Sequence, residues 1–335
     1  MVGPLLALLL QSGAPLPESW ALPATRPCSA EELSALTAAP DAADTPFRLI
    51  CRASLNGRPI LRRVLIEGGE ASGAGIDCGG AGIGRPGART TTRTPTVAIW
   101  SRRLDGAGPA QGPAWSRPTD VFLRNCTIHG AIRIWGMGVG GRIDDLRASS
   151  RTPGHTAAAQ AAGPSHITLT NLTFAATGSI PLYVGPGVTA VTVEGGRFNG
   201  RSDSTAIYLD AESAGNTLRN LTFDVRTPRE IIAVDGSARN TITGNRFALG
   251  GQGGVFLYRN CGEDAVIRHQ TPSDNVITDN VFTGASMLRP RTVVVGAREG
   301  GRRYCGDDRG WPFGSSLDDG DHATGNTVAR NRTGR

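Results

Sequence analysis

The stretch from Ala206 to Gly296 contains one pattern four times: Ala206-Ile-Tyr-Leu-Asp210, Ile231-Ile-Ala-Val-Asp235, Gly254-Val-Phe-Leu-Tyr258 and Thr292-Val-Val-Val-Gly296. Each copy alternates with period two, as in a β-strand whose successive side chains point to opposite faces. One face of every copy is aliphatic, and the other mixes aromatic, acidic and small side chains. The pattern therefore predicts four equivalent short strands.

Phenylalanines recur at a matching interval around these strands. The spacings are 24, 25, 24 and 35 residues between Phe174, Phe198, Phe223, Phe247 and Phe282. A period of this size indicates a stacked array, because a unit of short strands and turns cannot bury its apolar face alone. The wider last spacing predicts one coil with an inserted loop, between about Asn260 and Gln270.

Composition agrees with a turn-rich chain. The 335 residues include 46 Gly and 21 Pro and are 5% aromatic, and the repeat is unbroken, which favours a single domain over residues 25–335. The net charge is +6, and every basic residue other than histidine is Arg, because the sequence contains no Lys. A basic chain favours an anionic partner.

The N-terminal residues 1–24 are predicted to be a secretory signal peptide, since they hold the apolar run Leu5 to Leu10 followed by Pro-rich sequence. This run is too short to span a bilayer, and no later stretch is a candidate membrane span. We therefore expect a secreted or periplasmic protein.

Six cysteines occur: Cys28, Cys51, Cys78, Cys126, Cys261 and Cys305. An even number in an exported chain favours disulfides. We predict a Cys261–Cys305 bridge between two loops, one bridge among the first three cysteines, and a buried, free Cys126. No zinc-binding spacing of Cys and His is present.

A short helix is predicted at about residues 29–39. Ser29-Ala-Glu-Glu32 is a capping box, in which Ser29 and Glu32 bond each other's backbone N–H groups at a helix start. A stacked array needs a cap over its open core, and this helix lies where one is required.

The coil length, the capping helix and the element Asn240-Thr-Ile-Thr-Gly-Asn-Arg-Phe247 resemble right-handed parallel β-helix proteins of the pectate-lyase-like type. The resemblance covers residues 45 to 333. It implies an all-β fold: a single-stranded right-handed parallel β-helix (solenoid) with an N-terminal capping helix. It also implies polysaccharide lyases, uronate epimerases or glycosidases most often, and non-catalytic adhesins in other cases. Fold alone does not decide among them.

Stacking places equivalent side chains about 4.8 Å apart. Asp210, Asp235 and Tyr258 then form one outward column. A neighbouring column and the adjoining loops supply further candidates for substrate binding: Glu212, Arg229, Glu230, Arg259, Asn260, Glu263, Arg268 and Arg298. Two carboxylates this close repel, and a proton, cation or substrate must compensate, which favours a functional site.

Three chemistries fit these residues. Elimination or epimerisation of a uronate needs a base, and since Arg does not deprotonate, the candidates are Tyr258, His269 or a carboxylate. Hydrolysis would use Asp210 and Asp235 as the acid and its partner. Alternatively, Asp210, Glu212 and Asp235 could ligate Ca²⁺.

The favoured function is a lyase or epimerase acting on an acidic, uronate-containing polysaccharide. The alternatives are a glycoside hydrolase with a stacked carboxylate pair and a non-catalytic, carbohydrate-binding or surface structural solenoid. Nucleic acid is not an expected partner, because no nucleic-acid motif is present.

Overall fold

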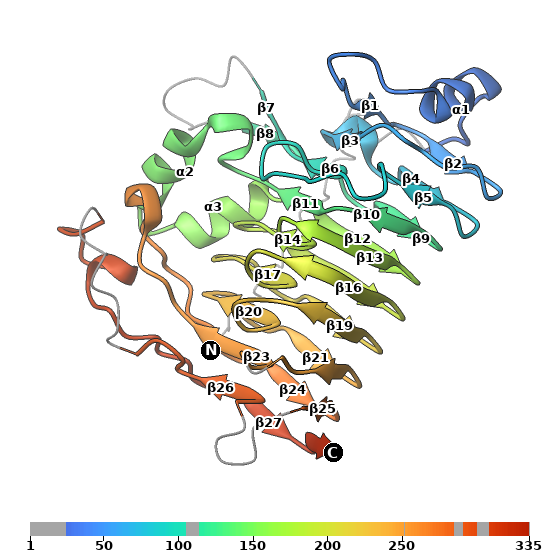
Figure 1. The fold of residues 1–335 in the computed structure, drawn as a ribbon. Coiled ribbons are helices and arrows are strands. Elements are labelled where there is room, and N and C mark those ends of the chain that lie inside the picture. The colour runs from blue at the N-terminus through green and yellow to red at the C-terminus, as the bar shows by residue number, and fades with distance from the viewer. Residues whose placement is uncertain (1–24, 105–113, 251, 285–290, 300–307, 335) are drawn as a thin grey trace, which may run out of the picture.

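The computed structural model describes residues 25–104, 114–250, 252–284, 291–299 and 308–334. These residues wind into successive coils, and each complete coil gives one strand to each of three parallel sheets, here called sheets I, II and III (Figure 1). This is the right-handed parallel β-helix that the sequence predicts. The predicted signal peptide lies outside the described residues.

Sheet I consists, in spatial order, of β1 (Phe47–Arg48), β3 (Val64–Glu67), β6 (Val97–Trp100), β11 (Ile132–Trp135), β14 (Leu182–Val184), β17 (Ile207–Leu209), β20 (Ile232–Asp235), β23 (Val255–Tyr258) and β26 (Val293–Val295). Sheet II consists of β2 (Arg52–Ser54), β4 (Gly75–Asp77), β9 (Phe122–Arg124), β12 (Ser165–Thr170), β15 (Thr189–Glu194), β18 (Thr217–Arg219), β21 (Thr241–Thr243), β24 (Val276–Thr278) and β27 (Thr327–Ala329). Sheet III consists of β5 (Gly82–Ile83), β10 (Thr127–His129), β13 (Thr173–Gly178), β16 (Arg197–Ser202), β19 (Thr222–Arg226), β22 (Arg246–Ala248), β25 (Val281–Thr283) and β28 (Arg332–Gly334).

The remaining elements are the helices α1 (Ala30–Thr37), α2 (Ile143–Ser150) and α3 (His155–Ala162), the antiparallel hairpin β7 (Arg102–Leu104) and β8 (Ala114–Ser116), and the short 3₁₀ turns η2 (Gly69–Ala71), η3 (Val139–Gly141), η4 (Glu263–Ala265) and η5 (Gly314–Ser316). In Figure 1, α1 lies at the N-terminal end of the coils, whereas α2 and α3 lie beside sheet I.

The predicted register is confirmed. Each of the strands β17, β20, β23 and β26 pairs in parallel with the next. The residues that face one another from strand to strand include Ile207, Ile232, Val255 and Val293. Within the coils, the five repeated phenylalanines form a continuous stack, with ring centroids 4.3 to 4.9 Å apart. The repeat of 24 to 35 residues is therefore one coil, and its interior is filled by equivalent side chains.

Repeated asparagines bond the turns between sheets II and III. The Asn245 side chain donates to Oδ1 of Asn280 at 2.9 Å, and Asn280 donates to Oδ1 of Asn331 at 2.9 Å. Asn245 and Asn280 are fully buried. The ladder satisfies backbone groups in the core, so these asparagines stabilise the coils and take no part in a site.

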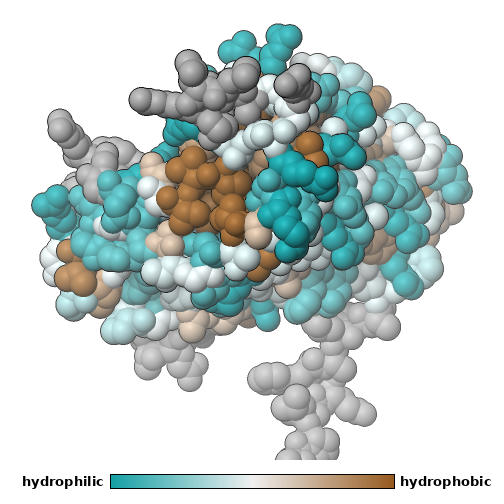
Figure 2. All heavy atoms as spheres, turned by 90° about the horizontal axis from the view of Figure 1, so that it is seen from below, coloured by the Kyte–Doolittle hydropathy of each residue, from teal (hydrophilic) through white to brown (hydrophobic). Residues whose placement is uncertain are grey.

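The two ends of the solenoid differ. At the N-terminal end, Ser29 and Glu32 form the predicted capping box, and Leu36 of α1 is fully buried against the core, although the helix ends at Thr37. At the other end, Val295 and Val328 are 41% and 45% exposed. Figure 2 views that end from below, where apolar side chains gather in the middle of the face.

Two disulfides join neighbouring coils: Cys28–Cys51 and Cys78–Cys126, each with Cα atoms 5.0 Å apart. The prediction of a free Cys126 is wrong, because stacking brings it beside Cys78 one coil away. Cys305 lies outside the described residues, so the Cys261–Cys305 bridge stays a prediction. Among the helices that the structure describes, none has the length and apolarity to cross a membrane.

Candidate functional site

Long connections leave sheet I on one side of the solenoid. Between sheets I and II, the connections after β11, β23 and β26 are long, and the first contains α2 and α3. The connections after β14, β17 and β20 are only a few residues each. The long connections therefore rise on both sides of a short-turn region, and the outer face of sheet I becomes the floor of a cleft.

This cleft has a volume of about 1180 Å³. Its floor is made by two columns of outward side chains. One column runs Arg133, Tyr183 and Tyr208 along β11, β14 and β17, and the other includes Trp135 and Asp210. All five of these residues line the cleft.

Aromatic side chains cover much of that floor. Trp100 is paired with Trp135 in the sheet, and the rings of Trp135 and Tyr183 meet edge-on at 5.7 Å. Gly185 makes room for them, because a Cβ atom there would lie 3.1 Å from the Tyr183 ring and 3.2 Å from the Trp135 ring. Adjacent aromatic rings with a polar edge are suited to ligands that have apolar faces and hydroxyl groups.

One wall of the cleft is the segment 259–270, here called the arch. It follows β23 and runs back along the solenoid to α2. Arg147 of α2 donates to the backbone oxygen of Asp264 at 2.6 Å, and Ile267 N–H donates to Ser150 Oγ at 3.0 Å. In Figure 1 this orange segment lies against α2. The arch thus joins coils that are far apart in the sequence.

Arg268 attaches the arch to the floor. Its guanidinium bonds the carboxylate of Asp210, and it lies 3.9 Å from the Asp235 carboxylate. Asp210 also accepts from the Tyr183 hydroxyl and, at 2.8 Å, from Ala211 N–H. The like-charge repulsion expected from stacked carboxylates is therefore compensated by a cation from the same chain.

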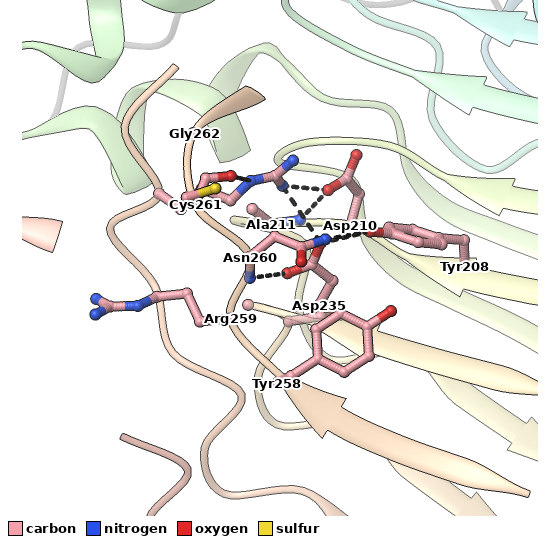
Figure 3. Close-up of polar contacts among 12 residues, drawn as sticks. Tyr208, Asp210, Ala211, Asp235, Tyr258, Arg259, Asn260, Cys261 and Gly262 are labelled. Atoms are coloured by element: carbon pink, nitrogen blue, oxygen red, sulfur yellow. Dashed lines mark hydrogen bonds and ion pairs between the residues drawn. The ribbon is translucent and has the colours of Figure 1, made fainter. Parts of the chain in front are cut away.

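Asp235 lies beneath the cleft surface and is fully buried. It accepts hydrogen bonds from Asn260 N–H at 2.7 Å, from the Asn260 amide at 2.6 Å and from the Tyr208 hydroxyl at 2.5 Å (Figure 3). Burial raises the pKa of Asp235, and the nearby Asp210 adds to this, while Arg268 opposes it. The predicted column of carboxylates is present, but of the two only Asp210 lines the cleft.

Tyr258 is also in the predicted column, but its hydroxyl is buried away from the cleft. It donates to Glu230 at 2.8 Å and accepts from Arg229 at 2.6 Å, and the guanidinium of Arg298 lies 4.1 Å from the ring centre. Burial, together with Asp235 and Glu230, raises the Tyr258 pKa well above its usual value. A buried phenol in its protonated form is poorly suited to act as a base.

His269 and Glu212 both bond within or beside the arch, and Glu212 also lines the cleft. His269 Nε2 lies 2.7 Å from the backbone oxygen of Ser150, and its ring packs against His155. The Glu212 carboxylate accepts from His269 N–H at 2.7 Å and from the Thr156 hydroxyl. His269 therefore does not line the cleft, whereas Glu212 lines it and also bonds the arch.

A calcium site was one alternative for Asp210, Glu212 and Asp235. These carboxylates do not converge on one point: Arg268 occupies the space beside the two aspartates, and Glu212 points to the arch. Within the described ranges, the sole group of three potential ligands close enough for a metal includes Cys28 and Cys51, which are bonded to each other. The residues present do not fit the ion.

The remaining candidates divide into two groups. Arg229, Asn260, Glu263 and Arg298 line the cleft, as does Arg268. Arg259 points away from it (Figure 3) and donates to Asp318 at 2.7 Å, and Glu230 is buried with Tyr258. Four further lining residues were not predicted from the sequence: Trp100, Arg133, Trp135 and Tyr183. Tyr183 carried a usable signal, because it lies one coil length before Tyr208.

Comparison with known proteins gives a family match. The model of the family described as "Right handed beta helix region" matches residues 114–295. Among solved structures, the surface adhesin PfbA of Streptococcus pneumoniae is similar at 12% identity and a TM-score of 0.40. That similarity covers 75% of this chain and 57% of the adhesin chain, so the chain spans little more than half of it. A search of curated proteins found no match.

Proposed function

From the premise that this chain belongs to the right-handed β-helix family, we propose that it is an exported carbohydrate-active protein whose cleft binds an acidic saccharide. The observation that carries the proposal is the meeting of an aromatic floor with several cations in one cleft. Tyr183 and Tyr208 offer ring faces, and Arg229 and Arg298 offer charge beside them. The two disulfides are typical of exported proteins.

Aromatic rings and guanidinium groups suit the two parts of a uronate. The faces of sugar rings carry C–H groups that pack on aromatic side chains, and a carboxylate binds Arg by paired hydrogen bonds. Arg133 stacks on the Tyr183 ring at 4.6 Å, so its charge lies next to the aromatic surface. We favour an acidic saccharide because the basic side chains Arg133, Arg229 and Arg298 are grouped in this one cleft.

A second candidate function is lyase or epimerase activity on the same saccharide. The grouped cations favour it, because they would stabilise a uronate carboxylate while a base removes the adjacent proton. In elimination, the electrons of that C–H bond form the C=C bond and the glycosidic oxygen leaves with its bonding pair. Tyr258 and His269 lie away from the cleft, and burial raises the pKa of Tyr183 and Tyr208 as it does that of Tyr258. The base would therefore be a carboxylate, and Asp210 lines the cleft. Hydrolysis with Asp210 and Asp235 is less favoured, since Asp235 does not line the cleft.

The test is a panel of uronate polysaccharides mixed with the mature protein, followed by calorimetry, ultraviolet absorbance and reducing-end assays. New absorbance with reducing ends means elimination, and reducing ends alone mean hydrolysis. Binding without either supports recognition alone. Arg229→Gln should weaken binding about tenfold or more, as expected for a charged hydrogen bond, and the matched Arg219→Gln on sheet II should not. No binding to any member of the panel would overturn the proposal.

A further inference from the structure

The outer face of sheet III is strongly basic. The stacked phenylalanines are buried in the core, so the residues on either side of each one, and the residues paired with those, point outward. The exposed outward residues include five arginines: Arg197 and Arg201 on β16, Arg226 on β19, Arg246 on β22 and Arg332 on β28. Among the described strands of this sheet, the one acidic side chain is that of Asp224. The face therefore carries a net positive charge.

These arginines differ from two arginines on sheet II that are held by acids. Arg124 lies 2.8 Å from Asp77, and Arg219 lies 2.7 Å from Glu194. Within the part of the chain that the structure describes, no carboxylate lies at ion-pair distance from three of the sheet III arginines: Arg197, Arg226 and Arg246. Their charge is therefore available to an external anion.

Arg201 is compensated only in part. It lies 3.9 Å from the carboxylate of Asp203, which Arg89 already bonds at 2.8 Å. Arg201 also lies directly opposite Arg226 in the sheet, and like charges in that position repel each other. An anion bound on this face would relieve the repulsion.

Arg197, Arg246 and Arg332 form one column along the solenoid axis, here called the arginine column. One residue of β19 separates the first two in the sheet, and one residue of β25 separates the last two. The arginines therefore occupy every second strand, about 10 Å apart, and the column spans about 19 Å. At its end Arg332 lies near Asp279, whose pKa is lowered by Arg330, which bonds it at 2.7 Å, and also by Arg332.

A linear acidic polysaccharide fits this column. Guanidinium groups bind carboxylates and sulfates, and Thr173, Asn199 and Thr222 on the same face can bond sugar hydroxyls. A nucleic acid fits less well, because its phosphates lie about 3.4 Å apart along each strand. The described strands of sheet III also present no outward Phe, Tyr or Trp side chain on which bases could stack. An anionic membrane attracts arginines too, but mobile lipid headgroups gain nothing from a regular spacing.

We propose that the outer face of sheet III is a second saccharide-binding surface, on which the arginine column binds a linear polysaccharide with a carboxylate or sulfate on alternate sugars. The polymer lies along the solenoid axis, outside the cleft on sheet I. This inference does not rest on the proposed function, because none of the arginines of this face lines the cleft.

The experiment measures, by calorimetry at low salt, the affinity for hyaluronan, a linear polysaccharide in which every second sugar is a uronate. A triple variant of the arginine column should bind about tenfold more weakly than wild type, because each exposed ion pair contributes a small amount. This variant is Arg197→Gln, Arg246→Gln and Arg332→Gln. The matched control lowers the net charge equally on the face of sheet II and should bind like wild type: Arg52→Gln, Arg124→Gln and Arg219→Gln. All six arginines are exposed, so both variants should fold.

Several outcomes would overturn this inference. Equal weakening in the two triple variants would mean that net charge alone attracts the polymer. Full affinity of the sheet III variant, with loss confined to Arg229→Gln, would assign the polymer to the cleft and leave the proposed function standing. Failure of hyaluronan to bind the wild-type protein would overturn the inference by itself, while the cleft is judged by its own panel of polysaccharides.

Vesicles of phosphatidylserine and phosphatidylcholine test the membrane alternative. The sheet III variant and wild type should bind these vesicles equally weakly. Vesicle binding that is lost in the sheet III variant, without binding of hyaluronan to wild type, would replace the polysaccharide by a lipid surface.

Discussion

The outer faces of sheets I and II have the same backbone and different surroundings. On sheet II, Thr168, Thr192, Thr217 and Thr241 lie side by side in successive strands, and each remains accessible to solvent. On sheet I, the equivalent column changes from coil to coil and is covered by the arch and by α2 and α3. Regular columns are consistent with a structural role, whereas an irregular, covered column marks the region where the repeat has been modified for another purpose.

The largest expected effect comes from breaking the ion pair under the arch. In Arg268→Met, the buried carboxylates of Asp210 and Asp235 lose their cation. Because an uncompensated buried charge is costly, the free energy of unfolding should fall by about 3–5 kcal/mol. Guanidinium denaturation measures this.

The matched control for this change is the double variant Arg268→Met with Asp235→Asn. Removing one of the two charges should restore part of the lost stability, because the remaining repulsion disappears. A single variant as stable as wild type would show that water, rather than Arg268, compensates the carboxylates.

A smaller effect is expected from the repeated ladder. In Asn245→Ala, Leu221 N–H loses its acceptor at 2.9 Å, and the backbone oxygen of Leu218 loses its donor at 3.0 Å. Two buried groups without partners should reduce the free energy of unfolding by about 2–3 kcal/mol. Thermal and denaturant unfolding measure it, and the saccharide affinity should not change. A loss of affinity in the folded variant would contradict a purely structural role for the ladder.

A pH-dependent effect is expected where α3 meets the arch. Burial lowers the pKa of His155 to about 3, and the neighbouring His269 and Arg268 contribute. Below the unfolded-state pKa of about 6.5, the unfolded chain binds a proton that the folded chain does not, so stability falls as the pH falls from about 6.5 toward 3. The loss from His155 alone should be about 2 kcal/mol at pH 5.

The free energy of unfolding is measured with denaturant at pH 7 and at pH 5. Carboxylates with ordinary or lowered pKa values stay largely ionised over this range, so they contribute little to the difference in stability. Burial also lowers the pKa of His129, so the comparison needs His155→Asn, which should remove most of the pH dependence. An unchanged slope in that variant would locate the effect elsewhere.

Much of the fold can be predicted from the sequence, because each coil makes the same contacts with the next coil. Equivalent residues in consecutive coils must touch, so the Phe stack, the strand register and the column of Asp210 and Asp235 follow from the spacing alone. The capping box is equally local, since Ser29 and Glu32 are three residues apart. These predictions are confirmed.

The site is only partly readable, because its walls break the repeat. Nothing in the spacing says that Arg147 will meet Asp264, 117 residues away, or that Arg268 will return to Asp210. Without that path, Tyr258 and His269 look accessible, and the cleft-lining Trp100 and Trp135 look like ordinary strand residues. The pairing of Cys126 was missed for the same reason, since a long insertion hides which coil it follows.

The smallest expected effect comes from an ion pair on the face of sheet II. Arg219 bonds Glu194 in the neighbouring strand at 2.7 Å, and the two side chains are 46% and 36% exposed. Since water and salt screen such a pair, Arg219→Met should change the free energy of unfolding by less than about 1 kcal/mol, and less still in 1 M salt. Denaturant unfolding of Arg219→Met and of Arg268→Met, each at two salt concentrations, measures the loss of stability in both variants. If the two arginine variants lost similar stability, then cover by the arch would not be what distinguishes the faces of sheets I and II.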